Sequence, residues 1–249
     1  MDKNKEQLKN LTTEFYQQIA LEFDPTRKYQ WVGWKKIFDF CRSRKFIPKG
    51  ILDVACGNGR FVETAHDLNP EINYLGIDSN EFLLDKANKN YAQKNKIEFR
   101  NVDIYDDWGL KKKYDLVVAF GIVHHLIDNR SRTIFFERIK NAVKENGFVV
   151  VTFWDFLSEP KLAKKIISQE KFTSIQVDGK NRLTKILNNL EVNDYILDWK
   201  RGQIAYRFAH YYTDKEIKQL ANSAELKIIE KFVADGSNKQ ANKYYIFSL

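Results

Sequence analysis

The sequence predicts a doubly wound α/β fold, in which a mostly parallel sheet carries helices on both faces. Short apolar runs alternate with helix-like segments from residue 50 to residue 153, and a glycine-rich turn follows the first run. We expect a core formed by residues 46–154 and 213–249. An N-terminal helical cap (residues 1–45) and an inserted lobe (residues 155–212) are expected to flank it.

Five apolar runs are predicted to be parallel strands: Gly50–Val54, Tyr74–Ile77, Ile97–Val102, Tyr114–Phe120 and Gly147–Phe153. The helix-like segments between them are Arg60–Leu68, Glu81–Gln93 and Arg130–Lys144, and residues 101–113 are expected to hold one short helix. Alternation of this kind implies right-handed crossovers and a sheet covered on both faces.

The N-terminal segment before this alternation is predicted to be helical. Apolar residues recur there every four residues, which is typical of a helix: Leu11, Phe15, Ile19 and Phe23. A second helix, capped by Thr26, is expected to run through Trp34, Ile37 and Phe38.

The end of the chain resumes the regular pattern. A helix over Asp214–Ser223 precedes strands near Leu226–Val233 and Tyr244–Phe247. Two strands so close together favour an antiparallel pair at the sheet edge. Residues 154–212 show no regular period, so they are predicted to form an insertion before the last two strands.

Composition indicates a globular protein without a membrane span. Among 249 residues, no apolar run approaches about 18 residues, and the first ten residues are polar. The only cysteines, Cys41 and Cys56, match no metal-ligand or disulfide spacing. We therefore expect a soluble, cytoplasmic protein with no metal site.

The net charge of +8 is concentrated outside the predicted core. Residues 1–50 carry +5 and residues 155–212 carry +3, whereas residues 51–154 carry −1. Basic flanks around a neutral core suit a polyanion such as a nucleic acid. Solvated surface lysines explain the charge equally well.

The turn from Asp53 to Gly59, "DVACGNG", predicts a nucleotide-like ligand at the end of the first strand. Its two glycines permit unusual backbone torsions and close approach by a ligand. A phosphate-binding P-loop is excluded because the required lysine is missing. A dinucleotide site is weakened because Val62 stands where a third glycine is needed. S-adenosylmethionine, which has no pyrophosphate, remains as the third candidate.

Residues after the next three strands favour S-adenosylmethionine. Asp78 ends the second strand, where its carboxylate could accept hydrogen bonds from a ribose diol. Asp103 could accept from an adenine amino group, with Ile104 against the ring. Phe120 and Gly121 follow the fourth strand, beside the expected position of the reactive methyl group.

These elements resemble the class I S-adenosylmethionine-dependent methyltransferases. The matching stretches are "LDVACGNG", "GIDSN", "NVDIYD", "YDLVVAFGIVHHL" and "NGFVVVTFW". The resemblance implies a seven-stranded Rossmann-like sheet with S-adenosylmethionine as cofactor. Ala55 departs from the glycine that is usual in the family. The expected cofactor-binding residues are Tyr16, Asp53, Ala55, Gly57, Gly59, Asp78, Ser79, Asp103, Ile104, Phe120 and Gly121.

The methyl acceptor is predicted from the flanks and from the histidine pair His124–His125. A histidine there could act as a base or orient the acceptor, and His124 is the one expected to face the cavity. In the inserted lobe, aromatic residues interleaved with Arg207 suit stacking on bases and pairing with phosphate or carboxylate.

Part of the chain resembles, more specifically, the methyltransferases that esterify a carboxymethyl group on the tRNA wobble uridine. The matching residues are Tyr16, Ile19, Ala20, Phe23, Thr26, Arg27, His124, His125 and the segment Arg207–Tyr212. The resemblance implies tRNA as a partner and, as in eukaryotic relatives, a small activator subunit. It also implies a carboxylate acceptor, which is ionised near neutral pH and needs positioning by cations such as Arg27 and Arg207 more than a base. Two alternatives stay open: methylation of a small carboxylic acid or phenol with the lobe as a lid, and a donor-binding module without activity.

Overall fold

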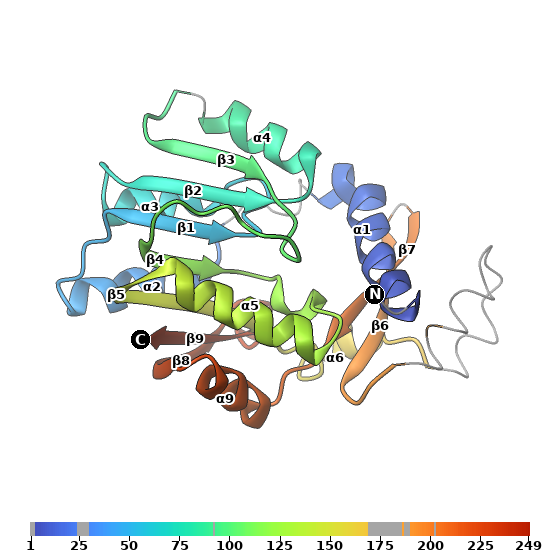
Figure 1. Cartoon of the computed structure of the whole chain (residues 1–249). Helices are drawn as coiled ribbons and strands as arrows, with labels where there is room; N and C mark the ends of the chain where they lie inside the picture. Colours follow the sequence, from blue (N-terminus) through green and yellow to red (C-terminus); the bar gives the residue numbers. More distant parts are fainter. Residues whose placement is uncertain (1–2, 24–29, 92, 169–185, 187–189, 202) are drawn as a thin grey trace.

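The computed structural model describes residues 3–23, 30–91, 93–168, 186, 190–201 and 203–249. Its main sheet has seven strands in the order β3-β2-β1-β4-β5-β9-β8, which confirms the doubly wound prediction (Figure 1). The strands are β1 Gly50–Val54, β2 Asn73–Asp78, β3 Ile97–Asn101, β4 Tyr114–Ala119, β5 Val143–Trp154, β8 Lys227–Ala234 and β9 Asn242–Ser248. The first five pair in parallel, and β9 runs antiparallel to both β5 and β8.

Helices cover both faces of this sheet. They are α2 Val32–Ser43, α3 Phe61–Leu68, α4 Glu81–Tyr91, α5 Asn129–Ala142 and α9 Asp214–Ser223. Along β1, Leu52 joins the apolar cluster that includes residues of α5 and α9, whereas Ile51 joins the one that includes residues of α2 and α3. Both side chains are fully buried, so the strand is enclosed on each face and shows no alternation between a buried and a solvent face.

Two local expectations need correction or lie outside the described residues. Residues 102–113 form turns rather than a short helix, because the Asp103 carboxylate accepts the Tyr105 backbone N–H and holds a tight turn. Helix α2 begins after Trp31, whose side chain makes no capping hydrogen bond. The expected cap, Thr26, lies outside the described residues.

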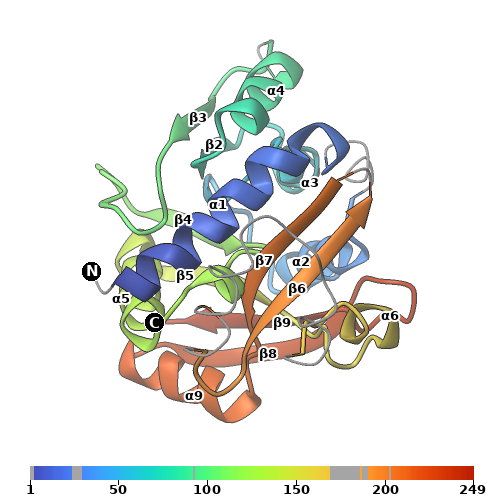
Figure 2. The ribbon, with the colours of Figure 1, turned by 90° about the vertical axis from the view of Figure 1, so that its right-hand side faces the viewer.

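The inserted segment contains a two-stranded antiparallel sheet that the sequence did not predict. Strands β6 Asp194–Arg201 and β7 Gln203–His210 pair along their length, preceded by the short helix α6 Pro160–Ala163. The N-terminal helix α1, Lys3–Phe23, packs on this hairpin, with Leu8 in one apolar cluster beside Phe208 and Phe15 in another beside Trp199. Helix α1 and the hairpin therefore stand together at the carboxyl ends of the parallel strands (Figure 2).

A buried charge network fastens the hairpin to the core. His210 of β7 lies between two carboxylates, with Nδ1 2.6 Å from Asp194 Oδ1 and Nε2 2.9 Å from Glu216 Oε1. Arg132 of α5 reaches the same oxygens at 3.3 and 3.5 Å. Burial lowers the pKa of His210, but its hydrogen bonds to the two carboxylates outweigh that effect, so the pKa is raised. With His210 protonated, the network holds two positive and two negative charges.

Within the described residues, no helix combines the length and apolar character that a membrane crossing requires.

Candidate functional site

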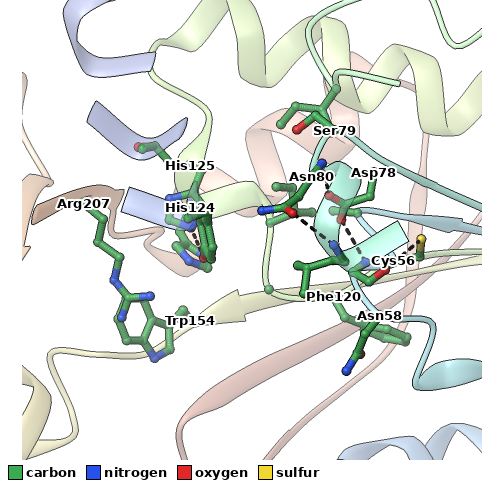
Figure 3. A pocket seen from close by; sticks show the side chains of 18 of the residues that line it. Cys56, Asn58, Asp78, Ser79, Asn80, Phe120, His124, His125, Trp154 and Arg207 are labelled. Carbon is green, nitrogen blue, oxygen red and sulfur yellow. Dashed lines mark hydrogen bonds between the residues drawn. The ribbon is translucent and has the colours of Figure 1, made fainter. Parts of the chain in front are cut away.

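A cavity of about 1210 Å³ lies at the carboxyl ends of the parallel strands. It adjoins the point between β1 and β4 where the strand order reverses, which is where open α/β sheets bind ligands. Helix α1 and the β6–β7 hairpin contribute to its opposite wall. Figure 3 shows Asp78, Cys56 and Asn58 of the strand ends on one side, facing Arg207 and Trp154 on the other.

The turn after β1 exposes its backbone to this cavity. Gly57 has φ +55°, and a Cβ built there would find only a Leu83 methyl group, at 3.8 Å. Ala55 also adopts a left-handed conformation, with φ +61°. The family's usual glycine at that position thus corresponds to a real backbone requirement, which alanine meets at a cost of roughly 1 kcal/mol.

Asp78 connects this turn to the next helix while facing the cavity. Its Oδ2 accepts the Gly57 N–H at 2.9 Å, and its Oδ1 accepts the Asn80 N–H at 2.8 Å. Burial raises the pKa of Asp78, and these backbone hydrogen bonds oppose that effect. Each carboxylate oxygen keeps a second lone pair for a ligand hydroxyl.

The loop after β3 supplies the next part of the wall. Ile104 and Tyr105 line the cavity beside Asp103. The Asp103 carboxylate is bound by Lys9 of α1, with Nζ 2.9 Å from Oδ2. Helix α1 is thus attached at the position where the sequence predicts an adenine amino group.

The end of β4 forms the floor between the two sides of the cavity. Gly121 has φ +67°, and the Trp31 ring comes within 3.3 Å of where its Cβ would be. Its N–H donates to the Thr152 hydroxyl at 2.8 Å. Glycine is required here by both the torsion and the ring that covers it. Phe120 lies beside it and also lines the cavity.

Two residues expected to contact the cofactor do not line the cavity. Asp53 is buried behind the turn, where it accepts the Tyr74 hydroxyl, and burial raises its pKa to about 7. Gly59 faces aromatic rings, since a Cβ there would lie 2.9 Å from Phe99 and 3.0 Å from Tyr91. Both residues shape the turn through packing instead.

The other expected cofactor-binding residues all line the cavity: Tyr16, Ala55, Gly57, Asp78, Ser79, Asp103, Ile104, Phe120 and Gly121. His124 and Arg207, expected at the acceptor, line it too. Arg27 lies outside the described residues.

The side of the cavity opposite Asp78 carries a buried cation among aromatic rings. The Arg207 guanidinium lies 4.4 Å from the Trp154 ring centroid and 5.2 Å from that of Phe15. Arg207 is only 7% exposed. In the part of the chain that the structure describes, it forms no ion pair with a carboxylate, and burial lowers its pKa.

The two histidines are both buried but differ in their contacts. His125 Nε2 lies 2.8 Å from the Tyr16 hydroxyl, and its Nδ1 lies 2.8 Å from the Phe208 carbonyl oxygen. Burial, with the nearby charge of Arg207, lowers the pKa of His125 to about 3. The His124 ring lies between its neighbour's ring and that of Trp154, at 4.1 and 5.0 Å.

Several cavity residues were not predicted from the sequence: Lys9, Trp31, Tyr105, Trp154 and Lys165. Trp154 directly follows the predicted fifth strand and ends β5, and its place at the carboxyl end of a parallel strand was the available signal. Lys9 and Lys165 reach the cavity only through the packing of α1 and the hairpin. Local sequence carries no sign of that packing.

The described residues fit S-adenosylmethionine. The exposed backbone at Gly57 leaves room for close approach, Asp78 offers a carboxylate, and Ile104 and Leu83 offer apolar surface. The absence of a P-loop lysine agrees with a ligand that lacks a pyrophosphate. In the described ranges, no three His, Cys, Asp or Glu side chains are grouped to hold a metal ion.

Comparisons with known proteins agree with this fit. Residues 52–149 match a methyltransferase domain family. The chain is 28% identical over 141 residues to the tRNA (carboxymethyluridine(34)-5-O)-methyltransferase of Arabidopsis thaliana, which covers 56% of this chain and 31% of that protein. It is 23% identical over 143 residues to the malonyl-[acyl-carrier protein] O-methyltransferase of Legionella pneumophila, covering 57% and 49%. The chain thus spans less than two thirds of either relative.

A solved structure shares the whole fold. The S-adenosylmethionine-dependent methyltransferase from Clostridium acetobutylicum superposes with a TM-score of 0.65 at 18% identity, over 94% of this chain and 98% of that one. The strand order, the cavity at the strand ends and the matched domain lead to one assignment. The chain has the fold of the class I S-adenosylmethionine-dependent methyltransferases, and its residues 52–149 match a methyltransferase domain family.

Proposed function

We propose that this protein esterifies a carboxylate, and that the carboxylate is the carboxymethyl group of a modified wobble uridine in tRNA. When bound, S-adenosylmethionine supplies a methyl group on a positively charged sulfur; attack by the carboxylate oxygen forms the O–CH₃ bond as the S–CH₃ electron pair returns to sulfur. Alignment of donor and acceptor accounts for most of such catalysis.

The observation that carries this proposal is the buried guanidinium of Arg207. A cation removed from water is costly unless an anion compensates it, and the described residues offer no carboxylate to do so. An acidic acceptor supplies the missing charge and is held by the planar donor fork of the guanidinium. No base is needed, because a carboxylate is ionised at neutral pH.

Two features favour a nucleotide over a small acid. Trp154, Trp199 and His124 place aromatic rings on the acceptor side of the cavity, which suits an unstacked base. The net positive charge is concentrated in residues 1–50 and 155–212, on either side of the core segment of residues 51–154. The plant relative is named for such a tRNA substrate.

The test is methyl transfer from labelled donor to tRNA with and without 5-carboxymethyluridine at the wobble position. We expect label only on the modified tRNA, recovered as the methyl ester nucleoside. The KM for tRNA should rise about tenfold or more between roughly 50 and 200 mM salt, because phosphate contacts release counterions. Donor binding without transfer to this tRNA would contradict the proposal.

A second candidate is esterification of a small carboxylic acid. The malonyl-[acyl-carrier protein] O-methyltransferase relative favours it, because its named substrate also carries a carboxyl group. The same salt series separates the two candidates. Turnover of a small acid should change little with ionic strength, since few charges are neutralised on binding.

For the donor, we propose that Asp78 binds the ribose diol. Asp78→Ala should weaken donor binding by about 1.5–3 kcal/mol, because charge-assisted hydrogen bonds are lost. Isothermal titration with S-adenosylmethionine measures this. Asp85→Ala, which removes an exposed carboxylate from α4, is the matched control. Unchanged affinity of the Asp78 variant would place the ribose elsewhere.

A further inference from the structure

A continuous chain of hydrogen bonds leads from the backbone of β7 to the guanidinium of Arg207. The Phe208 carbonyl contacts His125 Nδ1 at 2.8 Å, and His125 Nε2 contacts the Tyr16 hydroxyl at 2.8 Å. The Tyr16 side chain is in turn hydrogen-bonded to Arg207. The chain joins α1, the turn after β4 and the hairpin at the acceptor side of the cavity.

The direction of each hydrogen bond in this chain follows from the Phe208 carbonyl group at its start. A carbonyl oxygen only accepts, so His125 must carry its proton on Nδ1. The Nε2 atom of the neutral ring is then an acceptor, and Tyr16 must donate its hydroxyl hydrogen to it. The lone pairs of the Tyr16 oxygen are left to accept from a guanidinium N–H of Arg207.

The groups facing His125 keep it neutral. Arg207 is a nearby positive charge, the His124 ring lies tilted against the His125 ring with centroids 4.1 Å apart, and the Tyr105 hydroxyl donates to the His125 backbone carbonyl. None of them is an anion that would favour a protonated ring. His125 is therefore suited to hold a fixed hydrogen bond rather than to take a proton.

We propose that Tyr16 and His125 are positioning residues that fix the orientation of Arg207 toward the acceptor. One guanidinium N–H donates to Tyr16, and the Trp154 and Phe15 rings pack against the guanidinium group and restrict its orientation. The remaining N–H groups of Arg207 then point toward the acceptor in a fixed, planar arrangement. The inference rests on the proposed function, because the acceptor carboxylate is what this fork would bind.

This inference gives Tyr16 a role on the acceptor side. The sequence-based expectation placed it at the cofactor, from its spacing to Arg27 in the N-terminal segment. Its hydroxyl hydrogen is committed to His125 and its oxygen to Arg207. Loss of the hydroxyl should therefore disturb Arg207 and leave donor binding intact.

The first experiment reads the hydrogen bonds directly in the full-length protein. Nitrogen-15 NMR of the four histidines, with His125 assigned from a His125→Gln sample, should show a neutral ring protonated at Nδ1 from about pH 5 to 8. Tyr16→Phe should shift the His125 Nε2 resonance and the Arg207 Nε–H resonance together. Spectra in which neither resonance moves would overturn the inference, whatever the acceptor is.

The second experiment is a kinetic double-mutant cycle on carboxymethylated tRNA. Tyr16→Phe should raise the acceptor KM about tenfold, as expected for losing one hydrogen bond to a charged group, with the donor Kd unchanged. In an Arg207→Ala background the same change should add almost nothing, since Tyr16 acts through Arg207. Tyr195→Phe, which removes a hydroxyl from the hairpin outside the cavity, is the matched control.

The two experiments separate the inference from the proposed function. If the wild type does not methylate this tRNA, the proposed acceptor is wrong, and the NMR result alone decides the hydrogen-bond chain. Additive effects of Tyr16→Phe and Arg207→Ala, or an equal loss of donor affinity in Tyr16→Phe, would refute the positioning role.

Discussion

Replacing Asp194 by alanine is expected to lower the free energy of unfolding by about 3–5 kcal/mol, as is usual when one partner of a buried ion pair is removed. Asp194 is fully enclosed and accepts from both His210 and Arg132. Without it, Glu216 alone faces two buried cations. Urea unfolding followed by circular dichroism measures the loss.

The same network predicts how stability depends on pH. The pKa of His210 is raised in the folded protein, above an unfolded value of about 6.5. Its stabilisation is therefore complete below about pH 6.5 and is lost as pH rises through the folded pKa. We expect the difference in unfolding free energy between wild type and His210→Gln to be larger at pH 6 than at pH 9.

His66→Gln is the matched control for this pH series. His66 lies on α3, away from the network, and its pKa is lowered by burial and by Lys94. Its removal should not reproduce the trend of His210→Gln. Parallel pH curves for wild type and His210→Gln would show that His210 does not titrate against the two carboxylates.

The sheet could be predicted from the sequence because its strands are locally encoded. Strands buried on both faces are mainly apolar, as in Gly50–Val54, where Asp53 is the one charged residue, and glycines or polar turns separate them at regular intervals. The pair β8–β9 was predicted from a different signal, the closeness of the two strands in the sequence. The seven-stranded order is confirmed.

The hairpin β6–β7 was missed because its pattern is not that of an ordinary strand pair. Asp198 and Arg207 are buried within it, so polar positions do not mark a solvent face. Burial there depends on α1, which lies far away in the sequence. Local β-strand propensity cannot reveal a buried face that exists only because a helix distant in the sequence packs on it.

The acceptor side of the cavity likewise depends on contacts between residues far apart in the sequence, which local patterns do not predict. The sequence indicated the histidine pair and Arg207, but the Tyr16–His125 contact joins residues 109 positions apart. Which histidine makes it is decided by the short 3₁₀ helix η2 Val123–His125 and by the register of β7. A role for His124 as base or acceptor-orienting residue stays a prediction, whereas the hydrogen-bond chain runs through His125.

Arg207→Leu is expected to lower kcat/KM for the acceptor by about 100-fold or more, because a buried, hydrogen-bonded charge pair with the acceptor would be broken. Donor affinity should stay within about twofold, since Asp78 and the glycine turn lie on the other side of the cavity (Figure 3). Initial rates with carboxymethylated tRNA and calorimetric titration of the donor measure both quantities.

Two further variants distinguish charge from geometry. Arg207→Lys keeps the positive charge but loses the planar fork and the stacking on Trp154, so its activity should fall between wild type and Arg207→Leu. Arg130→Leu removes an exposed arginine from α5 and should leave the acceptor kinetics unchanged. Full activity of Arg207→Lys would mean that charge alone holds the acceptor.

Stability should respond to Arg207→Leu in the opposite way to Asp194→Ala. In the described structure Arg207 is a buried cation without a carboxylate partner, so folding it costs desolvation that no ion pair returns. A leucine among Trp154 and Phe15 avoids that cost, and the unfolding free energy should stay equal or rise. A variant that is destabilised yet still methylates the acceptor would show that Arg207 serves the fold. One that is as stable as wild type and inactive would show that the cation is kept for its substrate.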